Sequence, residues 1–271
     1  MRNNRYNWTL LLCVALLTSC GKNAAQPTSS TWTPPNNPKP YEILYEARVD
    51  AKNGDYPAAL TKQIWFYENA LKYDSALAGV RLSFAITDWV NLGAAYPLAL
   101  EKLKAVRDEA RENVRNKAGR EAYEAFMDFD AINEALKEDD KTKELFIWLD
   151  SNKPDKAKEL FELAESALVK AKEYRLCGKY IDAEASLAAA LKSYRMTSEI
   201  AKNPKLGKKT QDFADKKFVN TTTTLIALLV VNDRKTEAQN IVDQISKESE
   251  LPQFQAEIQK ALNGEIPTPW P

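Results

Sequence analysis

Residues 56–62 read YPAALTK, and residues 96–102 read YPLALEK. The two segments are 40 residues apart and are identical at five of seven positions. Internal repeats of this length are typical of stacked helical hairpins, because each hairpin buries its apolar face against the next one. Proline also suits the first turn of a helix, where its missing N–H costs nothing. The repeat therefore predicts a fold built from pairs of helices.

Glycine and proline recur along the chain at intervals that suit helix ends, and the segments between them are rich in Ala, Leu, Glu and Lys with helical apolar spacing. Residues 221–231 combine four threonines with aliphatic residues and would suit a strand by propensity. No second strand is available to pair with them, so we expect a buried helix and an all-α fold. The punctuating residues are Gly54/Pro57, Gly93/Pro97, Gly119, Pro154, Gly178, Pro204/Gly207 and Pro252.

Residues 174–183 read YRLCGKYIDA and precede Leu187 and Ala190. In residue type and spacing this segment resembles the tetratricopeptide repeat (TPR), and the NGDYPAAL run at 53–60 is similar to that family's turn and second helix. Weaker copies lie at 232–238 and around 152–157. The resemblance implies a TPR-like right-handed stack of helical hairpins, an α-α superhelix with irregular repeats, over residues 41–264. The spacing of 40 residues exceeds the family's 34, so a divergent helical-hairpin fold explains the pattern equally well.

The N-terminal residues predict an export signal. Two arginines precede an apolar stretch at residues 8–17, which has the length of a secretory signal core and about half the length of a membrane-spanning helix. The sequence LTSCG at 17–21 resembles the bacterial lipobox, which implies cleavage after residue 19 and acylation of Cys20. We therefore expect a signal peptide at 1–19 and a palmitate-bearing lipoprotein anchored in the cell envelope. By resemblance to lipoproteins of Gram-negative bacteria, Gly21 implies an outer-membrane protein facing the periplasm.

Both ends of the mature chain are rich in proline. Residues 20–40 are expected to form the lipidated cysteine and an extended tether, because they contain almost nothing that could build a core. Within this tether, Trp32 is interpreted as incidental rather than as a docking anchor. The tail at 265–271 has three prolines in its last five residues and cannot be helical.

Composition excludes several function classes. The chain carries 38 basic and 38 acidic residues with interspersed signs, which argues against a nucleic-acid partner. It contains no histidine, so His-dependent catalysis and the commonest transition-metal ligand are absent. Cys177 would be the one thiol left after processing and is interpreted as a packing residue in a turn between helices. We expect no catalytic residues, no metal and no cofactor.

The binding hypothesis rests on large side chains that their own helix does not bury. Trp65 shares a helix face with polar residues, so it should point outward or pack against a neighbouring repeat. Tyr41 and Tyr45 could line a groove from the first helix. Trp89 and Trp148 fall on apolar stripes and are expected in the core.

These observations predict a membrane-tethered TPR-like protein that binds another protein as an adaptor or envelope assembly factor, since stacked hairpins form concave surfaces for peptides or helices. One alternative is a lipoprotein that binds envelope polysaccharide or another polymer by stacking on Trp65 and nearby tyrosines. Another is an envelope enzyme that works with carboxylates alone.

Overall fold

The computed structural model describes residues 32–248 and 254–270 of the 271-residue chain. The predicted signal peptide, Cys20 and the first part of the tether lie outside the described residues. Within them every regular element is a helix and there is no strand, so the all-α prediction is confirmed. The elements are α1 (Pro40–Asn53), α2 (Tyr56–Tyr73), the 3-10 helix η1 (Ser75–Leu77), α3 (Ala78–Leu82), α4 (Phe84–Ala95), α5 (Pro97–Asn116), α6 (Gly119–Leu136), α7 (Asp139–Asn152), α8 (Pro154–Lys170), α9 (Tyr174–Tyr180), α10 (Ala183–Ala201), α11 (Gly207–Val231), α12 (Lys235–Glu248) and α13 (Phe254–Leu262).

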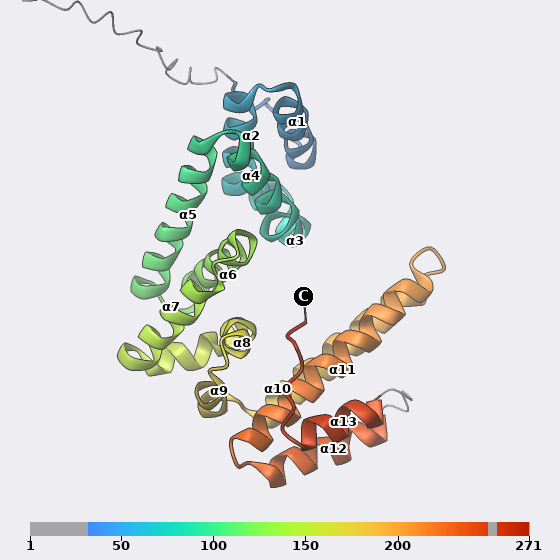
Figure 1. Ribbon diagram of the computed structural model, residues 1–271. Coiled ribbons are helices and arrows are strands. Elements are labelled where there is room, and N and C mark those ends of the chain that lie inside the picture. The colour runs from blue at the N-terminus through green and yellow to red at the C-terminus, as the bar shows by residue number, and fades with distance from the viewer. Residues whose placement is uncertain (1–31, 249–253, 271) are drawn as a thin grey trace, which may run out of the picture.

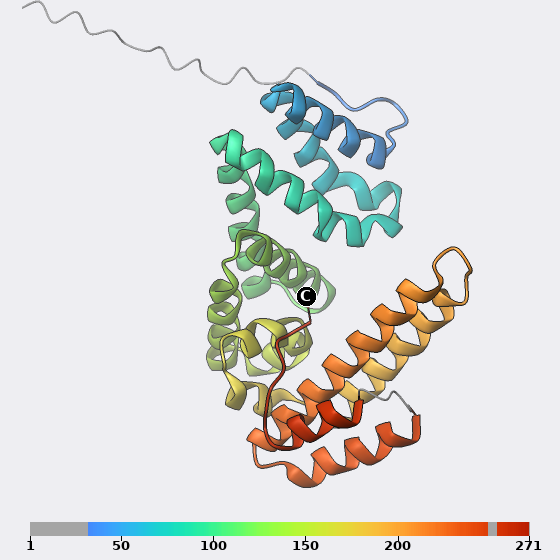
Figure 2. The same ribbon diagram turned by 45° about the vertical axis from the view of Figure 1, so that its right-hand side comes forward.

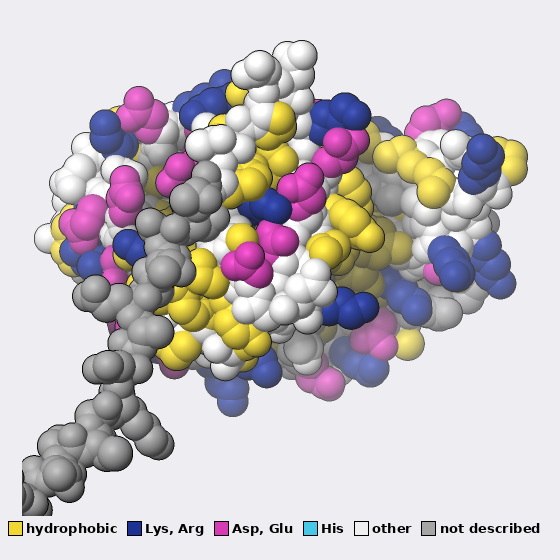
Figure 3. Space-filling view, turned by 90° about the horizontal axis from the view of Figure 1, so that it is seen from above, with side chains coloured by type: hydrophobic (Ala, Val, Ile, Leu, Met, Phe, Trp, Pro, Cys, Tyr) yellow, Lys and Arg dark blue, Asp and Glu magenta, His cyan; other side chains and the backbone are white. Residues whose placement is uncertain are grey.

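The helices form two parts that we call the column and the arm. The column is α1–α9, in which consecutive helices stack one after another (Figure 1). The arm is α10–α13, a long antiparallel hairpin of α10 and α11 with α12 and α13 against its base. The arm turns back beside the column, so the molecule is open on one side (Figure 2). Seen from above, the column and the end of the arm are separate lobes (Figure 3).

The two copies of the repeat occupy equivalent places in the column. Each begins the second helix of a hairpin, α2 in the pair α1–α2 and α5 in the pair α4–α5. Gly54 ends α1 in the left-handed conformation, at φ 82°, which favours glycine. A Cβ atom on Gly93 would lie 2.9 Å from the Cβ of Leu100, so glycine permits the close approach of α4 and α5. The rings of Tyr56 and Tyr96 stack with centroids 6.0 Å apart, so the repeat copies contact each other directly.

Two segments depart from the regular stacking of helical hairpins. The short elements η1 and α3 lie between the first two hairpins, and Arg81 of α3 forms a bidentate ion pair with Asp128 of α6. Further along, the turn expected at Cys177 is wrong, because residues 174–180 form the short helix α9. The chain reverses instead at Lys172, which has φ 62°, and at Ile181, where the backbone is extended.

The buried side chains join the arm to the column. One cluster packs α1 against α2 and α4, and a second fills the space between α2, α4, α5 and α6. A third is one connected cluster that runs from Ala110 of α5 to Ala261 of α13. The junction is reinforced by Arg234, whose guanidinium donates to the carbonyl oxygens of Gly178 and Ile181 at 3.2 and 3.0 Å. The threonine-rich segment lies in this core as part of α11, which confirms the helical prediction.

Candidate binding grooves

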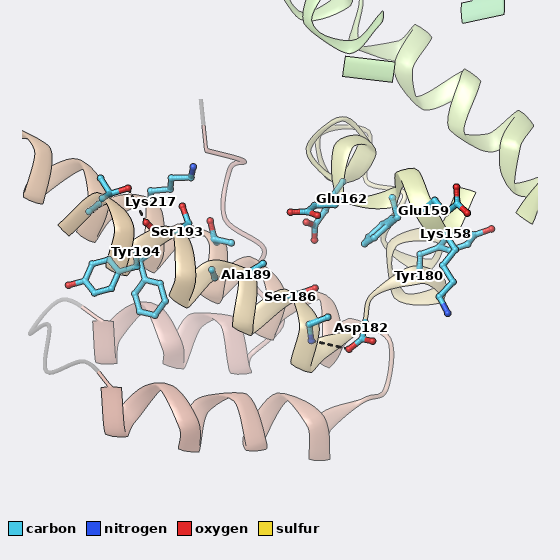
Figure 4. Close-up of a pocket in the computed structure, with 18 residues that line it drawn as sticks. Lys158, Glu159, Glu162, Tyr180, Asp182, Ser186, Ala189, Ser193, Tyr194 and Lys217 are labelled. Atoms are coloured by element: carbon cyan, nitrogen blue, oxygen red, sulfur yellow. Dashed lines mark hydrogen bonds between the residues drawn. The ribbon is translucent and has the colours of Figure 1, made fainter. Parts of the chain in front are cut away.

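A groove runs between the column and the arm and is lined by α8, α9, α10 and α11. We call it the α8–α10 groove; its cavity has a volume of about 370 Å³. Glu162 of α8 points across it toward the face of α10 that carries Ala189 and Ser193 (Figure 4). Tyr180 closes the groove on the side of α9, and Lys217 lies on α11 at the other end. The volume lies in the range of sites that hold a small molecule or a few side chains.

The α10 wall of this groove is built from small side chains. Ala185, Ala189 and Ser193 recur every four residues and therefore lie on one face of the helix. Asp182 begins the helix by accepting a hydrogen bond from the backbone N–H of Ala185 at 3.0 Å. Alanine favours a helix while extending little from it. The wall therefore lets another backbone approach α10 closely.

The α8 wall carries carboxylates. Burial, with a smaller contribution from the nearby charge of Glu162, raises the pKa of Glu165 to about 7. No hydrogen bond or ion pair within the described ranges holds Glu165. Four acidic residues and two lysines line the groove, so its lining carries a net negative charge. The acidic residues are Glu159, Glu162, Glu165 and Asp182, and the lysines are Lys158 and Lys217.

Cys177 lies next to this groove but is closed off from it. Its side chain is fully buried, and burial raises the pKa of the thiol to about 12, with the nearby Glu165 charge adding to the effect. A thiol with a raised pKa is a poor nucleophile at neutral pH. The structure therefore agrees with the interpretation of Cys177 as a packing residue.

A second, wider groove lies on the column between α2, α3, α5 and α6. We call it the α2–α6 groove; its cavity has a volume of about 880 Å³. The Arg81–Asp128 pair lies in its wall, and the Arg81 guanidinium carbon sits 4.0 Å from the centre of the Tyr67 ring. Burial, together with the Asp128 carboxylate, raises the pKa of the Tyr67 hydroxyl. The partly exposed side chains of Leu71 and Tyr123 give this groove some apolar surface.

The sequence-predicted binding residues lie outside both grooves. Trp65 lies on α2 and is half-buried beside the N-terminal segment. The centroid of its ring is 6.2 Å from that of Trp32 and 5.8 Å from that of Tyr73. Trp32 therefore docks on the first hairpin and is not incidental. Tyr41 and Tyr45 are 57% and 60% exposed on α1, and they line neither groove.

The two tryptophans predicted for the core differ in burial. Trp89 is fully buried, and its indole N–H donates to the carbonyl oxygen of Ala99 at 2.8 Å, which confirms its prediction. Trp148 is half-buried at the edge of the core, with the Arg115 guanidinium carbon 4.7 Å from the ring centre.

The α8–α10 groove was not found from the sequence. The acidic residues of the groove lie on the polar face of α8, as they would on any amphipathic helix. Its small residues on α10 are common helix-forming residues, so neither set marks a site in the sequence. The available signal was the run of alanines and serines at 183–190, read together with the glutamates of α8.

Comparison of the chain with protein-family models, with curated proteins and with solved structures yields no match. Within the described ranges, no helix has both the length and the apolar character needed to cross a bilayer. In the same residues, no group of three or more Cys, Asp or Glu side chains is arranged to hold a metal ion. The two grooves are therefore the features of this protein that point to a function.

Proposed function

We propose that this protein is a helical-repeat adaptor that binds a segment of a partner protein in the α8–α10 groove. The proposal rests on one observation: carboxylates on α8 that have no ion-pair partner among the described residues face a wall of mostly small side chains on α10 across an open cavity. Stacked helical hairpins commonly hold extended or helical peptides in such concave spaces.

The chemistry of the groove selects the kind of segment. The alanine and serine wall accepts a helix or extended strand at close range, because Ala185, Ala189 and Ser193 extend little from α10. Tyr194, the large side chain of α10 that lines the groove, donates its hydroxyl to Asp215 of α11. A lysine or arginine from that segment would reach the carboxylates of Glu162 and Glu165, for which the described residues provide no ion pair. Ion pairs in a partly buried cleft contribute more than exposed ones, since water screens them less. The partner segment is therefore expected to be basic on one side and small or apolar on the other.

A pair of arginine substitutions tests this proposal. Ala189 lines the groove, whereas its exposed neighbour Ala188 on α10 does not. We expect Ala189→Arg to abolish recovery of the partner in a crosslinking pull-down from membranes, scored by mass spectrometry. Ala188→Arg adds the same side chain and charge outside the groove and should recover the partner as the wild type does.

The outcomes of this experiment separate the two grooves. Equal recovery of the partner by Ala189→Arg and by wild type would refute binding in the α8–α10 groove. If Leu71→Arg then removed the partner, the binding site would be the α2–α6 groove. A wild-type bait that recovers no protein partner in repeated trials would refute the adaptor function itself.

Anchoring in the cell envelope through Cys20 is part of the proposal, supported by the lipobox-like residues 17–21 and the apolar stretch before them. Two acyl chains give stable attachment, because each buried methylene contributes about 0.8 kcal/mol. We expect Cys20→Ala to move the protein from the membrane fraction to the soluble fraction. Unchanged membrane retention of the processed variant would contradict lipid anchoring at this residue.

A further inference from the structure

The end of the α10–α11 hairpin has a composition unlike the rest of the chain. We call residues 195–209 the hairpin tip. They contain five basic residues and one acidic residue, Glu199, whereas the whole chain has no net charge. The basic residues are Arg195, Lys202, Lys205, Lys208 and Lys209.

Large apolar side chains are exposed among these charges. Met196 and Ile200 are 59% and 53% exposed, and they lie one turn apart on the same face of α10. Leu206 is 49% exposed and immediately precedes α11. Single exposed apolar residues are ordinary, but three of them at one projecting end form a surface that water solvates poorly.

The end of the α10–α11 hairpin extends past the helices that cover its base. Helices α12 and α13 pack on the base of the hairpin, and the C-terminal segment crosses α11 at Asn220, whose amide donates to the carbonyl oxygen of Thr268 at 2.9 Å. Nearer the tip, Trp270 packs on Phe213 with ring centroids 5.6 Å apart. In the described ranges, α10 and α11 continue past this contact to the loop that joins them (Figures 1 and 2), and the lobe on the right of Figure 3 shows apolar and basic side chains with some acidic ones.

Most of the lysines at the tip have no internal partner. Lys202 pairs with Glu199 of its own helix at 2.5 Å. No ion pair within the described ranges holds Lys205, Lys208 or Lys209. Their ammonium groups are therefore free to meet anions outside the chain.

We propose that the hairpin tip docks on an anionic lipid bilayer. The tip is a convex, projecting end, so its apolar side chains can enter a deformable interface, whereas a rigid protein partner would need a matching concave pocket. Met196, Ile200 and Leu206 enter the boundary between headgroups and acyl chains, and the lysines contact lipid phosphates. This combination of apolar and basic side chains is the one that binds membrane interfaces. The proposal is independent of partner binding in the α8–α10 groove and of lipid at Cys20.

An environment-sensitive fluorophore at the tip tests this docking. The full-length chain, with Cys13→Ser and Cys20→Ser, carries Ile200→Cys labelled with NBD; Cys177 stays, because it is fully buried. We expect a blue shift and higher intensity with vesicles of equal phosphatidylglycerol and phosphatidylcholine, and no change with phosphatidylcholine alone. The matched control carries the label at Asn240→Cys, an exposed position on α12, and should not respond.

Removing the lysine charges gives a second test. Each lysine near an anionic surface strengthens binding about fivefold, so Lys205→Gln, Lys208→Gln and Lys209→Gln together should weaken vesicle binding roughly a hundredfold. Because these side chains hold nothing inside the protein, the melting temperature should stay at the wild-type value. The proposal is overturned if the label at position 200 does not respond to anionic vesicles, if position 240 responds equally, or if the triple variant binds as wild type. A response to soluble polyglutamate but not to vesicles would instead assign the tip to an acidic protein.

Discussion

The column and the arm differ in how far neighbouring helices cover their apolar and basic side chains. In the column, every hairpin is covered by the next one, and partly buried ion pairs such as Arg48–Asp88 and Arg107–Glu138 join one helix to another. In the arm, the 25-residue α11 runs past the helices that cover its base, so apolar and basic side chains are left together at its end. The stacked hairpins therefore explain how the column buries its side chains, whereas the surfaces that we propose to bind a partner and a membrane lie where the stack gives way to the arm.

The largest expected effect concerns the core of the column. Trp89→Ala removes a fully buried indole and its hydrogen bond to Ala99, and should lower the free energy of unfolding by about 3–5 kcal/mol. Trp65→Ala removes a half-buried ring and should cost about 1–2 kcal/mol. Urea unfolding followed by circular dichroism measures both. Equal losses would mean that Trp65 belongs to the core as fully as Trp89 does.

The junction between column and arm depends on the close packing of Gly178 against Asn232. A Cβ atom on Gly178 of α9 would lie 2.1 Å from Cγ of Asn232, whose amide donates to the carbonyl oxygens of Tyr174 and Leu228. Gly178→Ala should therefore cost about 2–3 kcal/mol in the free energy of unfolding. Gly79→Ala is the control, because a Cβ atom there meets open space within α3. A Gly178→Ala variant as stable as wild type would show that the junction is loose.

Glu165 in the α8–α10 groove should make the stability of the protein depend on pH. The pKa of Glu165 is raised from 4.5 to about 7, so the folded state holds its proton more tightly than the unfolded state does. Stability should therefore fall as pH rises from about 4.5 to about 7. Glu165→Gln removes this cost and should be about 2–3 kcal/mol more stable than wild type at pH 8, with the two equal near pH 4. Thermal melts across this range test it, and parallel pH profiles would contradict the burial of this carboxyl.

The smallest expected effect is at the hairpin tip. Met196→Ser and Ile200→Ser remove exposed apolar side chains that pack little inside the protein, so each should change the free energy of unfolding by less than about 0.5 kcal/mol. Chemical denaturation measures this directly. A loss as large as that expected at Trp65 would mean that the tip serves folding rather than docking.

Local signals in the sequence predicted the helices well. The Gly54/Pro57 pair coincides with the loop between α1 and α2, because a left-handed glycine ends a helix and proline suits the first turn of the next one. Pro97 likewise begins α5, but the prediction that Gly93 marks a helix end is wrong, because Gly93 lies inside α4 and packs closely on Leu100. The short helix α3 was not predicted, since residues 78–82 lack both a cap and a periodic apolar stripe. Residues 174–183 matched TPR spacing, yet α9 is only seven residues long and its turns fall elsewhere.

The candidate site was less predictable, because it depends on how helices distant in sequence are placed. Trp65 was expected to lie off the apolar stripe of α2; it is half-buried beside the cluster that joins α1, α2 and α4, and its contact with Trp32 comes from a proline-rich segment without periodicity. The groove arises because α9 and α11 hold α8 and α10 apart. Nothing in the pattern of either α8 or α10 encodes that separation, so Glu165 and Ala189 could not be chosen from the sequence.

Site-specific photocrosslinking in living cells measures whether a partner protein occupies the α8–α10 groove. A photoreactive phenylalanine analogue replaces Lys158, an exposed residue that lines the groove, in one strain, and Ala188, an exposed residue outside it, in another. We expect one discrete crosslinked species from position 158 and none from position 188. Crosslinks of equal yield from both positions, or none from position 158 while position 71 in the α2–α6 groove crosslinks, would contradict binding in the α8–α10 groove.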